Sequence, residues 1–407
     1  MTAHETTVGV VGAGPVGLVA AIALARAGVP FVLVDAHEGP VVESRAIIVH
    51  AGMLEVLDDL GVAGDLVAQG WRVPSMHLAL GDRVLGSVSL AHVSGRFPFI
   101  LTVPQSTTES VLRRHLADLG REPLAGHTVT GLTRHGDVHE VTGNARDGRP
   151  FTVRSRHVIG ADGRGSAIRA ALGVRLPRNP YPQLIHLADV ALSGPPEASG
   201  LYTYLSARGM LLLGPLPGDR WRIIASSHPS PGTAATAPPP PDRQDLLSFL
   251  ARGPSGTGLE QIEWASTIRI EHGVVDRFDR GRVLLAGDAA HVHSPAGGMG
   301  MNTGVQDGYD AAASIAAVVR GADPGDALPG YGRRRRAAVQ EVLRFTDRLL
   351  RLETAEGRFV RPAALMGLST LGRIPALRRR QALELSCVTR VPWRTGSPPL
   401  PASLVEA

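Results

Sequence analysis

The chain has 407 residues, of which 43% are hydrophobic and 48 are glycine, enough to bury a sizeable core in two domains or in one elaborated domain. The formal net charge is +5 and the sequence pI is about 10.0, but the cations are all arginine and are scattered, so we expect no nucleic-acid partner. The single cysteine, Cys387, excludes an internal disulfide and a cysteine-rich metal site.

The N-terminal stretch Met1 to Thr7 is polar and leads directly into an apolar segment, so it does not have the form of a secretory signal. No uninterrupted apolar run reaches the length of a membrane span. The sequence therefore predicts a cytoplasmic protein without a membrane partner.

The first predicted elements form a strand, helix, strand unit. Thr7 to Val11 and Phe31 to Val34 are apolar and β-branched, and Pro15 to Ala27 between them favours a helix. Two further apolar strands are predicted at His157 to Gly160 and Arg282 to Ala286, each followed by a glycine-containing turn and a helix. Repeated units of this kind are typical of a doubly wound α/β domain.

Other segments alternate apolar and polar residues between turns, notably Arg72 to Leu90 and Tyr181 to Ser227, and predict a second, antiparallel sheet. Ser230 to Pro241 reads as a loop, and the segment after Tyr331 has helical spacing interrupted at Pro362 and Pro375. The predicted fold class is α/β with α+β elements. We assign 1–72, 98–178 and 265–330 to a discontinuous Rossmann-like domain, 73–97 and 179–264 to an antiparallel-sheet substrate domain, 331–391 to C-terminal helices and 392–407 to a loose tail.

The first glycine motif is G-x-G-x-x-G, placed between a strand and a helix, with Pro15 and Val16 inside it. Gly12 permits a tight turn, Gly14 lets the backbone approach a pyrophosphate, and Gly17 lets helix and strand pack closely. Asp35, at the end of the second strand, is placed to accept a hydrogen bond from a ribose hydroxyl, which favours FAD or NAD over NADP. By themselves these residues are equally suited to either dinucleotide.

Two more motifs follow: Val158 to Gly163, with Arg164, Ser166 and Arg169 after it, and Gly281 to His291, continuing through Pro295 to Asn302. In this order and at these separations, the three motifs resemble those of the group A FAD-dependent aromatic monooxygenases related to p-hydroxybenzoate hydroxylase. The resemblance is to the aromatic polyketide and pentachlorophenol hydroxylase subgroup without its C-terminal thioredoxin-like domain. It extends from about Thr7 to Val391.

The resemblance implies hydroxylation of an aromatic, polyketide-derived metabolite through a flavin C4a-hydroperoxide, with NADPH or NADH as transient reductant and O2 as co-substrate. It implies direct roles beside the flavin for Pro295 and Arg45. It implies FAD contacts by Gly12, Gly14, Pro15, Val16, Gly17, Asp35, Arg45, Gln105, Asp162, Gly287, Asp288, Pro295, Gly298, Gly300, Met301 and Asn302. The first amides of a helix opening at Gly300 would stabilise negative charge on the flavin. A rigid loop proline, a helix-capping Asp288 and solvated Gln105 and Arg45 are the simpler alternatives.

The sequence departs from the family at three points near the expected flavin ring. The stretch from Asp307 to Ile315 stands where the family usually has Asp-Ala-x-Asn-Leu-x-x-Lys-Leu. Met299 replaces the usual glutamine, and His272 is followed by Gly273 where an arginine is usual within a few residues. An FAD-dependent reductase or dehydrogenase on the same scaffold is therefore an alternative hypothesis, and a non-catalytic nucleotide-binding partner is a third.

The substrate is expected between the flavin and the second sheet. Strand alternation places about half of the candidates inward. The candidates are Met76, Leu78, Tyr202, Tyr204, Met210, Leu212 and Trp221. His291 and His293 lack a third ligand at a suitable spacing, so no metal site is predicted. Monomer and homodimer are both compatible with the sequence.

Overall fold

The structure is a computed structural model that describes residues 2–40, 45–91, 93, 95–206, 208–228, 238–354, 375–398 and 400. Most of the predicted loop 230–241, and Pro362, lie outside the described residues. None of the helices in the described part of the chain has the length and apolar character needed to cross a bilayer.

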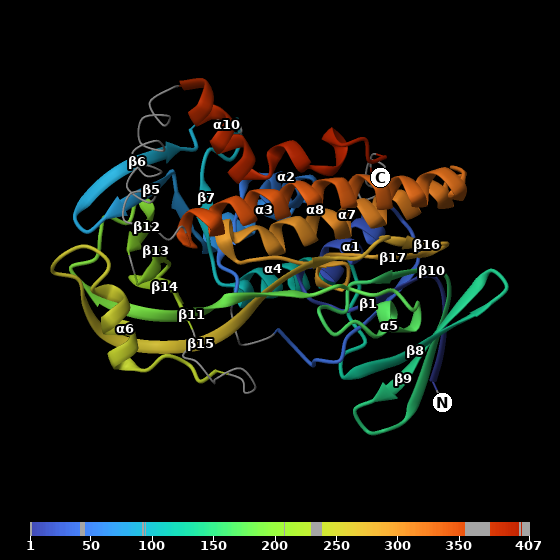
Figure 1. The fold of residues 1–407 in the computed structure, drawn as a ribbon. Helices are drawn as coiled ribbons and strands as arrows, with labels where there is room; N and C mark the ends of the chain where they lie inside the picture. Colours follow the sequence, from blue (N-terminus) through green and yellow to red (C-terminus); the bar gives the residue numbers. More distant parts are fainter. Residues whose placement is uncertain are drawn as a thin grey trace.

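A largely parallel sheet forms the centre of the dinucleotide domain (Figure 1). In sheet order its strands are β16 (Asp279–Arg280), β17 (Val283–Leu285), β10 (Pro150–Gly160), β1 (Thr2–Val11) and β2 (Phe31–Val34), with β9 (Val138–Ala145) and β8 (His127–His135) continuing from β10. Strands β2, β1, β10 and β17 pair in parallel. Their central residues are fully buried, as expected for strands covered on both faces.

Helices that contact one another and this sheet complete the domain. Their bounds are α1 (Pro15–Arg26), α2 (Ala51–Asp59), α3 (Ala63–Gln69), α4 (Gln105–Asp118), α5 (Ala167–Ala171) and α7 (Met299–Val319). A small sheet of β3 (Ile48–Val49), β7 (Ile100–Thr102) and β4 (Trp71–Val73) lies beside them. Helix α7 packs directly against α1, so the first and third glycine motifs meet.

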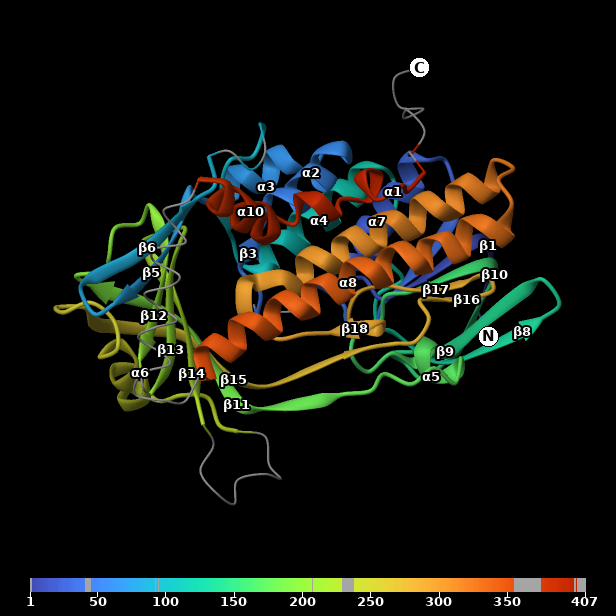
Figure 2. The ribbon, with the colours of Figure 1, turned by 45° about the horizontal axis from the view of Figure 1, so that its top comes forward.

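The second sheet has eight strands and forms the other layer (Figure 2). In order they are β18 (His291–Val292), β15 (Gly258–Val274), β11 (Asn179–Ser193), β14 (Arg220–Ser227), β13 (Gly209–Leu216), β12 (Gly200–Ser206), β5 (Ser75–Leu80) and β6 (Arg83–Ser89). One face packs against α6 (Arg243–Leu250) in a core of its own, and the other joins the main core. The predicted combination of a Rossmann-like domain with an inserted sheet is confirmed.

Two predicted boundaries differ from the structure. The limit between 264 and 265 falls inside β15, a continuous strand that runs from the second sheet toward the dinucleotide domain. The C-terminal helical region begins with α8 (Pro324–Thr354), continues in α10 (Pro375–Ser386), and ends in the short helices η3 (Val388–Arg390) and η4 (Pro392–Arg394). The predicted tail is not loose at its start, because Pro392 and Ser397 are buried and the Trp393 ring lies 5.7 Å from that of Tyr309.

Gly308 tests the contact between α1 and α7. A Cβ atom at Gly308 would lie 2.3 Å from the carbonyl oxygen of Val16, a backbone atom that cannot move aside. We expect Gly308→Ala to lower the free energy of unfolding in urea by about 1–3 kcal/mol. Gly64→Ala is the matched control, since a Cβ there meets nothing within 4 Å, and we expect it to be neutral or stabilising by up to about 1 kcal/mol. Equal effects of the two changes would contradict this account of the helix contact.

Candidate active site

The first glycine turn is shaped by two close backbone contacts and one open position. Gly12 has φ +100°, and a Cβ there would lie 2.3 Å from the Ala161 carbonyl oxygen. A Cβ at Gly17 would lie 1.8 Å from the carbonyl oxygen of Gly12. A Cβ at Gly14 would meet nothing within 4 Å. Packing therefore requires the outer two glycines, whereas Gly14 leaves room for a ligand to approach the backbone.

The N-terminus of α1 is suited to an anion. Its N-cap is Gly14, which supplies no side-chain acceptor, and Pro15 occupies the first turn, where no acidic residue lies. The amides of such a first turn have no intrahelical partner and carry partial positive charge. A pyrophosphate over Gly14 would accept their hydrogen bonds.

Asp35 connects the glycine turn to β2. Its carboxylate is buried and accepts hydrogen bonds from the backbone N–H of Ala13 and, at 2.6 Å, from that of His37. A carboxylate has about four lone-pair sites, so the predicted ribose contact is compatible with these bonds. Sequence reasoning missed Arg113 of α4, which donates to the Ala13 carbonyl at 3.2 Å from the other side of the turn. Nothing in its local sequence distinguishes it from other helix arginines.

Asp162, in the second motif, acts as a structural cap. Its carboxylate accepts from the Ser166 hydroxyl at 2.6 Å and from the Ile168 N–H at 3.1 Å, which holds the start of α5. The buried Arg169 donates to the carbonyls of Arg164 and Ala289 at 2.8 and 3.0 Å. The second motif is thereby attached to the third.

The third motif closes over the first. Gly287, with φ +60°, lies against Val16, since a Cβ there would be 2.8 Å from a Val16 methyl carbon. The following Asp288 has an exposed side chain. The surrounding protein nevertheless desolvates this carboxyl and raises its pKa, an effect that the charges of His291, Arg164 and Arg45 oppose. Residues from the second and third motifs and from the segment at Arg45 thus share one electrostatic neighbourhood.

The loop before α7 is held by Asn302 and His50. The Asn302 side chain donates to the carbonyls of Ile48 and Gly298 at 2.8 and 2.7 Å and accepts from the His50 N–H at 2.7 Å. The His50 ring donates through Nε2 to the Gly297 carbonyl at 2.7 Å. The left-handed Gly298 caps α7 without a side-chain acceptor, so the first turn of α7, including Gly300 and Met301, begins with free amides. Asn302 shapes this turn with its side chain.

A buried chain of polar groups supports the third motif from behind. Asp307 of α7 accepts from His291 Nε2 at 2.6 Å, from the Gly287 N–H at 3.1 Å and from Arg335 Nε at 2.6 Å. His291 Nδ1 lies 3.1 Å from His293 Nε2. Burial alone would raise the Asp307 pKa, but the charges of Arg335 and His291 outweigh it and hold the pKa below its usual range. Sequence reasoning had used Asp307 only as a point of comparison with the family.

These partners determine the tautomers of the two histidines. An ionised Asp307 accepts the Nε2 proton of His291, so His291 Nδ1 accepts the Nε2 proton of His293 when both rings are neutral. His293 Nδ1 is then a free acceptor on a partly exposed ring beside Gly300, where a Cβ would lie 3.8 Å from it. A group of three or more His, Cys, Asp or Glu side chains able to hold a metal ion is absent from the described residues.

The departures at Met299 and Gly273 have structural explanations. The Met299 side chain is buried beside Val342 and Cys387, whose Sγ lies 3.3 Å from the Met299 sulfur, so it points into a core cluster. A Cβ at Gly273 would lie 1.9 Å from the carbonyl oxygen of Pro177, so the chain requires glycine there. Both departures are therefore accounted for by packing.

Gln105, Arg45 and Pro295 border the site through backbone and side-chain contacts. Gln105 is the first residue of α4. Its backbone N–H donates to the Ala46 carbonyl at 3.0 Å, and its side-chain amide donates to the Glu109 carboxylate at 2.9 Å. The Arg45 carbonyl accepts from Arg222 at 3.1 Å. The Pro295 carbonyl accepts the Gly298 N–H at 2.9 Å within the loop before α7. Ser44, the neighbour of Arg45 in the family motif, lies outside the described residues.

The predicted substrate residues divide between the two faces of the second sheet. Met76, Met210 and Leu212 pack against the main core, toward the dinucleotide domain. Three others are corrected by the structure, because they belong to the separate core beneath α6 on the opposite face: Tyr202, Tyr204 and Trp221. Adjacent strand residues point to opposite faces. In the structure the aromatic candidates point away from the dinucleotide domain, and the aliphatic candidates point toward it.

Arg222, next to Trp221, is the residue that sequence reasoning missed on the inner face. It is fully buried and forms a two-point ion pair with Asp189, at 2.5 and 3.0 Å. Its guanidinium lies 5.2 Å from the Trp264 ring. A cation in an apolar strand is the sequence signal that could have indicated it.

The comparisons with known proteins agree with this geometry. Residues 5–346 match the model of a family described as an FAD binding domain. That match covers most of the chain. The chain belongs to this FAD-binding family.

The most informative relatives are aromatic monooxygenases. The chain is 34% identical over 375 residues to 6-methylpretetramide 4-monooxygenase of Streptomyces rimosus, covering 91% of this chain and 66% of the relative. It is 29% identical over 362 residues to pentachlorophenol 4-monooxygenase of Sphingobium chlorophenolicum, covering 87% and 66%. The chain thus spans slightly less than two thirds of the length of these curated relatives.

Among solved structures, the anhydrotetracycline hydroxylase of Streptomyces rimosus superposes with a TM-score of 0.77 at 29% identity, over 94% of this chain and 76% of that one. The resemblance to the aromatic polyketide and pentachlorophenol hydroxylases is therefore confirmed, as is the fold class. In sequence and fold the chain is thus similar to FAD-dependent monooxygenases.

The buried Asp307 gives the first test of the site. In Asp307→Asn the Arg335 guanidinium would remain in the core without a counter-charge. We expect a loss of about 3–5 kcal/mol in the free energy of unfolding, measured by chemical denaturation. The exposed Asp326→Asn removes the same charge from α8 and should change stability by less than about 0.5 kcal/mol. A mild effect of Asp307→Asn would contradict the role given to this ion pair.

Buried histidines predict a pH dependence of stability. Desolvation lowers the pKa of His50 and of His157 from 6.5 to about 4. The unfolded state therefore binds protons between pH 6.5 and 4 that the folded state does not, so the free energy of unfolding falls as the pH falls through this window. Each histidine contributes a slope of up to about 1.4 kcal/mol per pH unit.

Unfolding titrations between pH 4 and 7 measure this slope. We expect His157→Gln to reduce this slope by up to about 1.4 kcal/mol per pH unit, which corresponds to one proton. His228 is exposed, and we expect His228→Gln to leave the slope unchanged. A slope that is the same in all three proteins would show that His157 is not responsible.

Proposed function

We propose that this protein hydroxylates an aromatic, polyketide-derived metabolite, with FAD as cofactor, NADPH or NADH as reductant and O2 as co-substrate. The observation that carries the proposal is the convergence of three distant glycine motifs on one edge of the parallel sheet. Gly12 contacts Ala161, Val16 contacts Gly287, and the charge of Arg45 acts on Asp288. A dinucleotide that reaches from the first motif to the third needs this arrangement.

The residues present fit FAD. The uncapped α1 with the open Gly14 would hold the pyrophosphate, Asp35 the ribose, and Asp288 with Gln105 the ribityl chain. The uncapped first turn of α7, at Gly300 to Asn302, would face the pyrimidine edge of the flavin. FAD, when bound, supplies the two-electron chemistry and the activation of oxygen. Asp162 would act indirectly, by holding the second motif.

The protein contributes charge complementarity and proton placement. The first backbone amides of α7 stabilise negative charge placed at the N-terminus of this helix. Desolvation and the neighbouring His291 lower the pKa of His293 to about 3, so its ring stays neutral at physiological pH. His293 Nδ1 can accept a proton and pass its Nε2 proton to His291, where Asp307 stabilises the resulting charge.

The substrate would lie against the inner face of the second sheet. Met76, Met210 and Leu212 supply an aliphatic surface there, and Ile224 and Trp264 lie on the same face. Such a surface suits a flat, apolar ring system. Arg222 fixes this face to the Arg45 backbone and so links the substrate side to the predicted nucleotide contact. Cytoplasmic location and a monomeric or homodimeric state remain predictions.

The reaction itself is tested with isotopic oxygen. The FAD-loaded protein is incubated with NADPH or NADH, 18O2 and a panel of polycyclic phenols, and the products are analysed by mass spectrometry. We expect one 18O atom per product molecule and no turnover without oxygen. Anaerobic conversion of a substrate would instead support the reductase alternative, and failure of the purified protein to retain FAD would contradict the proposal as a whole.

A further inference from the structure

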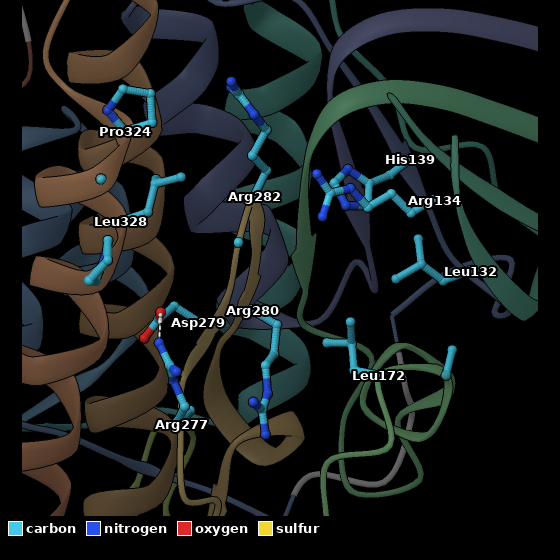
Figure 3. A pocket seen from close by; sticks show the side chains of 14 residues that line it. Leu132, Arg134, His139, Leu172, Arg277, Asp279, Arg280, Arg282, Pro324 and Leu328 are labelled. Carbon is cyan, nitrogen blue, oxygen red and sulfur yellow. Dashed lines mark hydrogen bonds and ion pairs between the residues drawn. The ribbon is translucent and has the colours of Figure 1, made fainter. Parts of the chain in front are cut away.

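A pocket with a volume of about 680 Å³ lies at the start of the third glycine motif, away from the first motif (Figure 3). We call it the arginine pocket. It is lined by Leu132, Arg134, His139, Ala171, Leu172, Arg277, Asp279, Arg280, Gly281, Arg282, Pro324, Gly325, Leu328 and Pro329. These residues come from β8, β9, the end of α5, β16 and the start of α8.

The arginine pocket is separate from the candidate active site. Arg282 immediately precedes β17, whereas Gly287 and Asp288 follow it, so the strand separates the two sites. Of the residues in the three glycine motifs, the pocket lining includes Gly281 and Arg282 at the start of the third motif. The motif residues that contact another motif do not line it. A ligand here would leave the FAD site free.

Positive charge dominates the pocket walls. Four arginines line it, against one carboxylate, Asp279, which is already paired with Arg277 at 3.1 Å. Arg280 lies 3.4 Å from the exposed Asp276. Within the described part of the chain, the hydrogen bonds of Arg134 and Arg282 go to the Gly136 carbonyl at 2.7 Å and to His157 Nε2 at 3.4 Å, both uncharged groups. These two cations remain available to an anion.

His139 provides an independent sign of a ligand. It is 5% exposed and lines the pocket, and its Nδ1 has no hydrogen-bond partner among the described residues. The ring also bonds to the backbone of Arg156, so Nδ1 is the ring atom that is left unpaired among the described residues. Figure 3 shows the His139 ring beside Arg134, both directed toward Arg282. Buried polar atoms are rarely left unpaired. A ligand hydroxyl could donate to this nitrogen, and the protonated ring could donate to an oxyanion.

The remaining walls are apolar. Leu328 is buried, and Leu132, Leu172, Pro324 and Pro329 present carbon surface between the arginines. An inorganic ion would leave this surface uncovered. A ring system carrying an acidic group covers the carbon surface and meets the cations, and the volume is that of a typical small-molecule site.

We propose that the arginine pocket binds an aromatic oxyanion, a flat ring system bearing a carboxylate or a phosphate, at a site distinct from the active site. Arg134 and Arg282 contact the oxyanion, His139 contacts it or an adjacent hydroxyl, and the leucines and prolines contact the ring. A phenolic acid and a nucleoside phosphate share this chemistry.

Isothermal titration of the FAD-saturated protein tests the proposal, since bound FAD excludes these probes from its own site. The probes are 1-hydroxy-2-naphthoate and AMP, with 2-naphthol and adenosine as uncharged counterparts. We expect at least one anion to bind and its uncharged counterpart to bind at least tenfold more weakly. Binding by the naphthoate alone identifies a phenolic acid, and binding by AMP alone identifies a nucleotide.

Variants assign the binding to this pocket. We expect Arg134→Gln and Arg282→Gln each to weaken the anion about tenfold, while Arg83→Gln, which removes the same charge from an exposed position on β6, stays within twofold. Unchanged FAD content and melting temperature show that the variants are folded. The proposal is overturned if neither anion binds, or if the arginine variants bind it as tightly as the Arg83→Gln control.

Discussion

The ion pair between Asp307 and Arg335 organises the centre of this protein. Both side chains are fully buried, and each is costly to bury without the other. Asp307 also accepts from the Gly287 backbone and from His291, so a single carboxylate links α8, α7 and the third glycine motif. The orientation of the two histidines follows from it. Loss of this charge would affect the fold and the chemistry together.

Close helix packing depends on the absence of side chains at a few positions. Val16, inside the first glycine motif, lies against Gly287, Gly304 and Gly308. Val16 and Gly287 are 271 positions apart in the chain (287 − 16), but this contact brings the first and third motifs together. The glycines thus serve two purposes, since Gly14 leaves space for a ligand and the others leave space for the protein itself.

The two faces of the second sheet belong to different cores. Its outer face packs against α6 with the tyrosines and Trp221, and its inner face carries Arg222 and aliphatic residues. Arg222 connects this face to the segment at Arg45 through a backbone hydrogen bond. The same β17 that leads to the FAD motif begins at the arginine pocket, so the two proposed sites lie at opposite ends of one strand.

The sequence alone determined the βαβ unit, the inserted sheet and the FAD family, because glycine spacing and apolar periodicity are local properties of the chain. Helix α1 and strand β2 were predicted to within one residue. The sequence did not determine which face of the second sheet points toward the dinucleotide domain. Side chains alternate between the two faces of a strand, and only the packing of another layer decides which face is the inner one. The sequence also did not reveal that Asp307 meets Arg335, or that Gly273 lies against Pro177. Those contacts join residues far apart in the chain, and only the tertiary structure decides which of them are made.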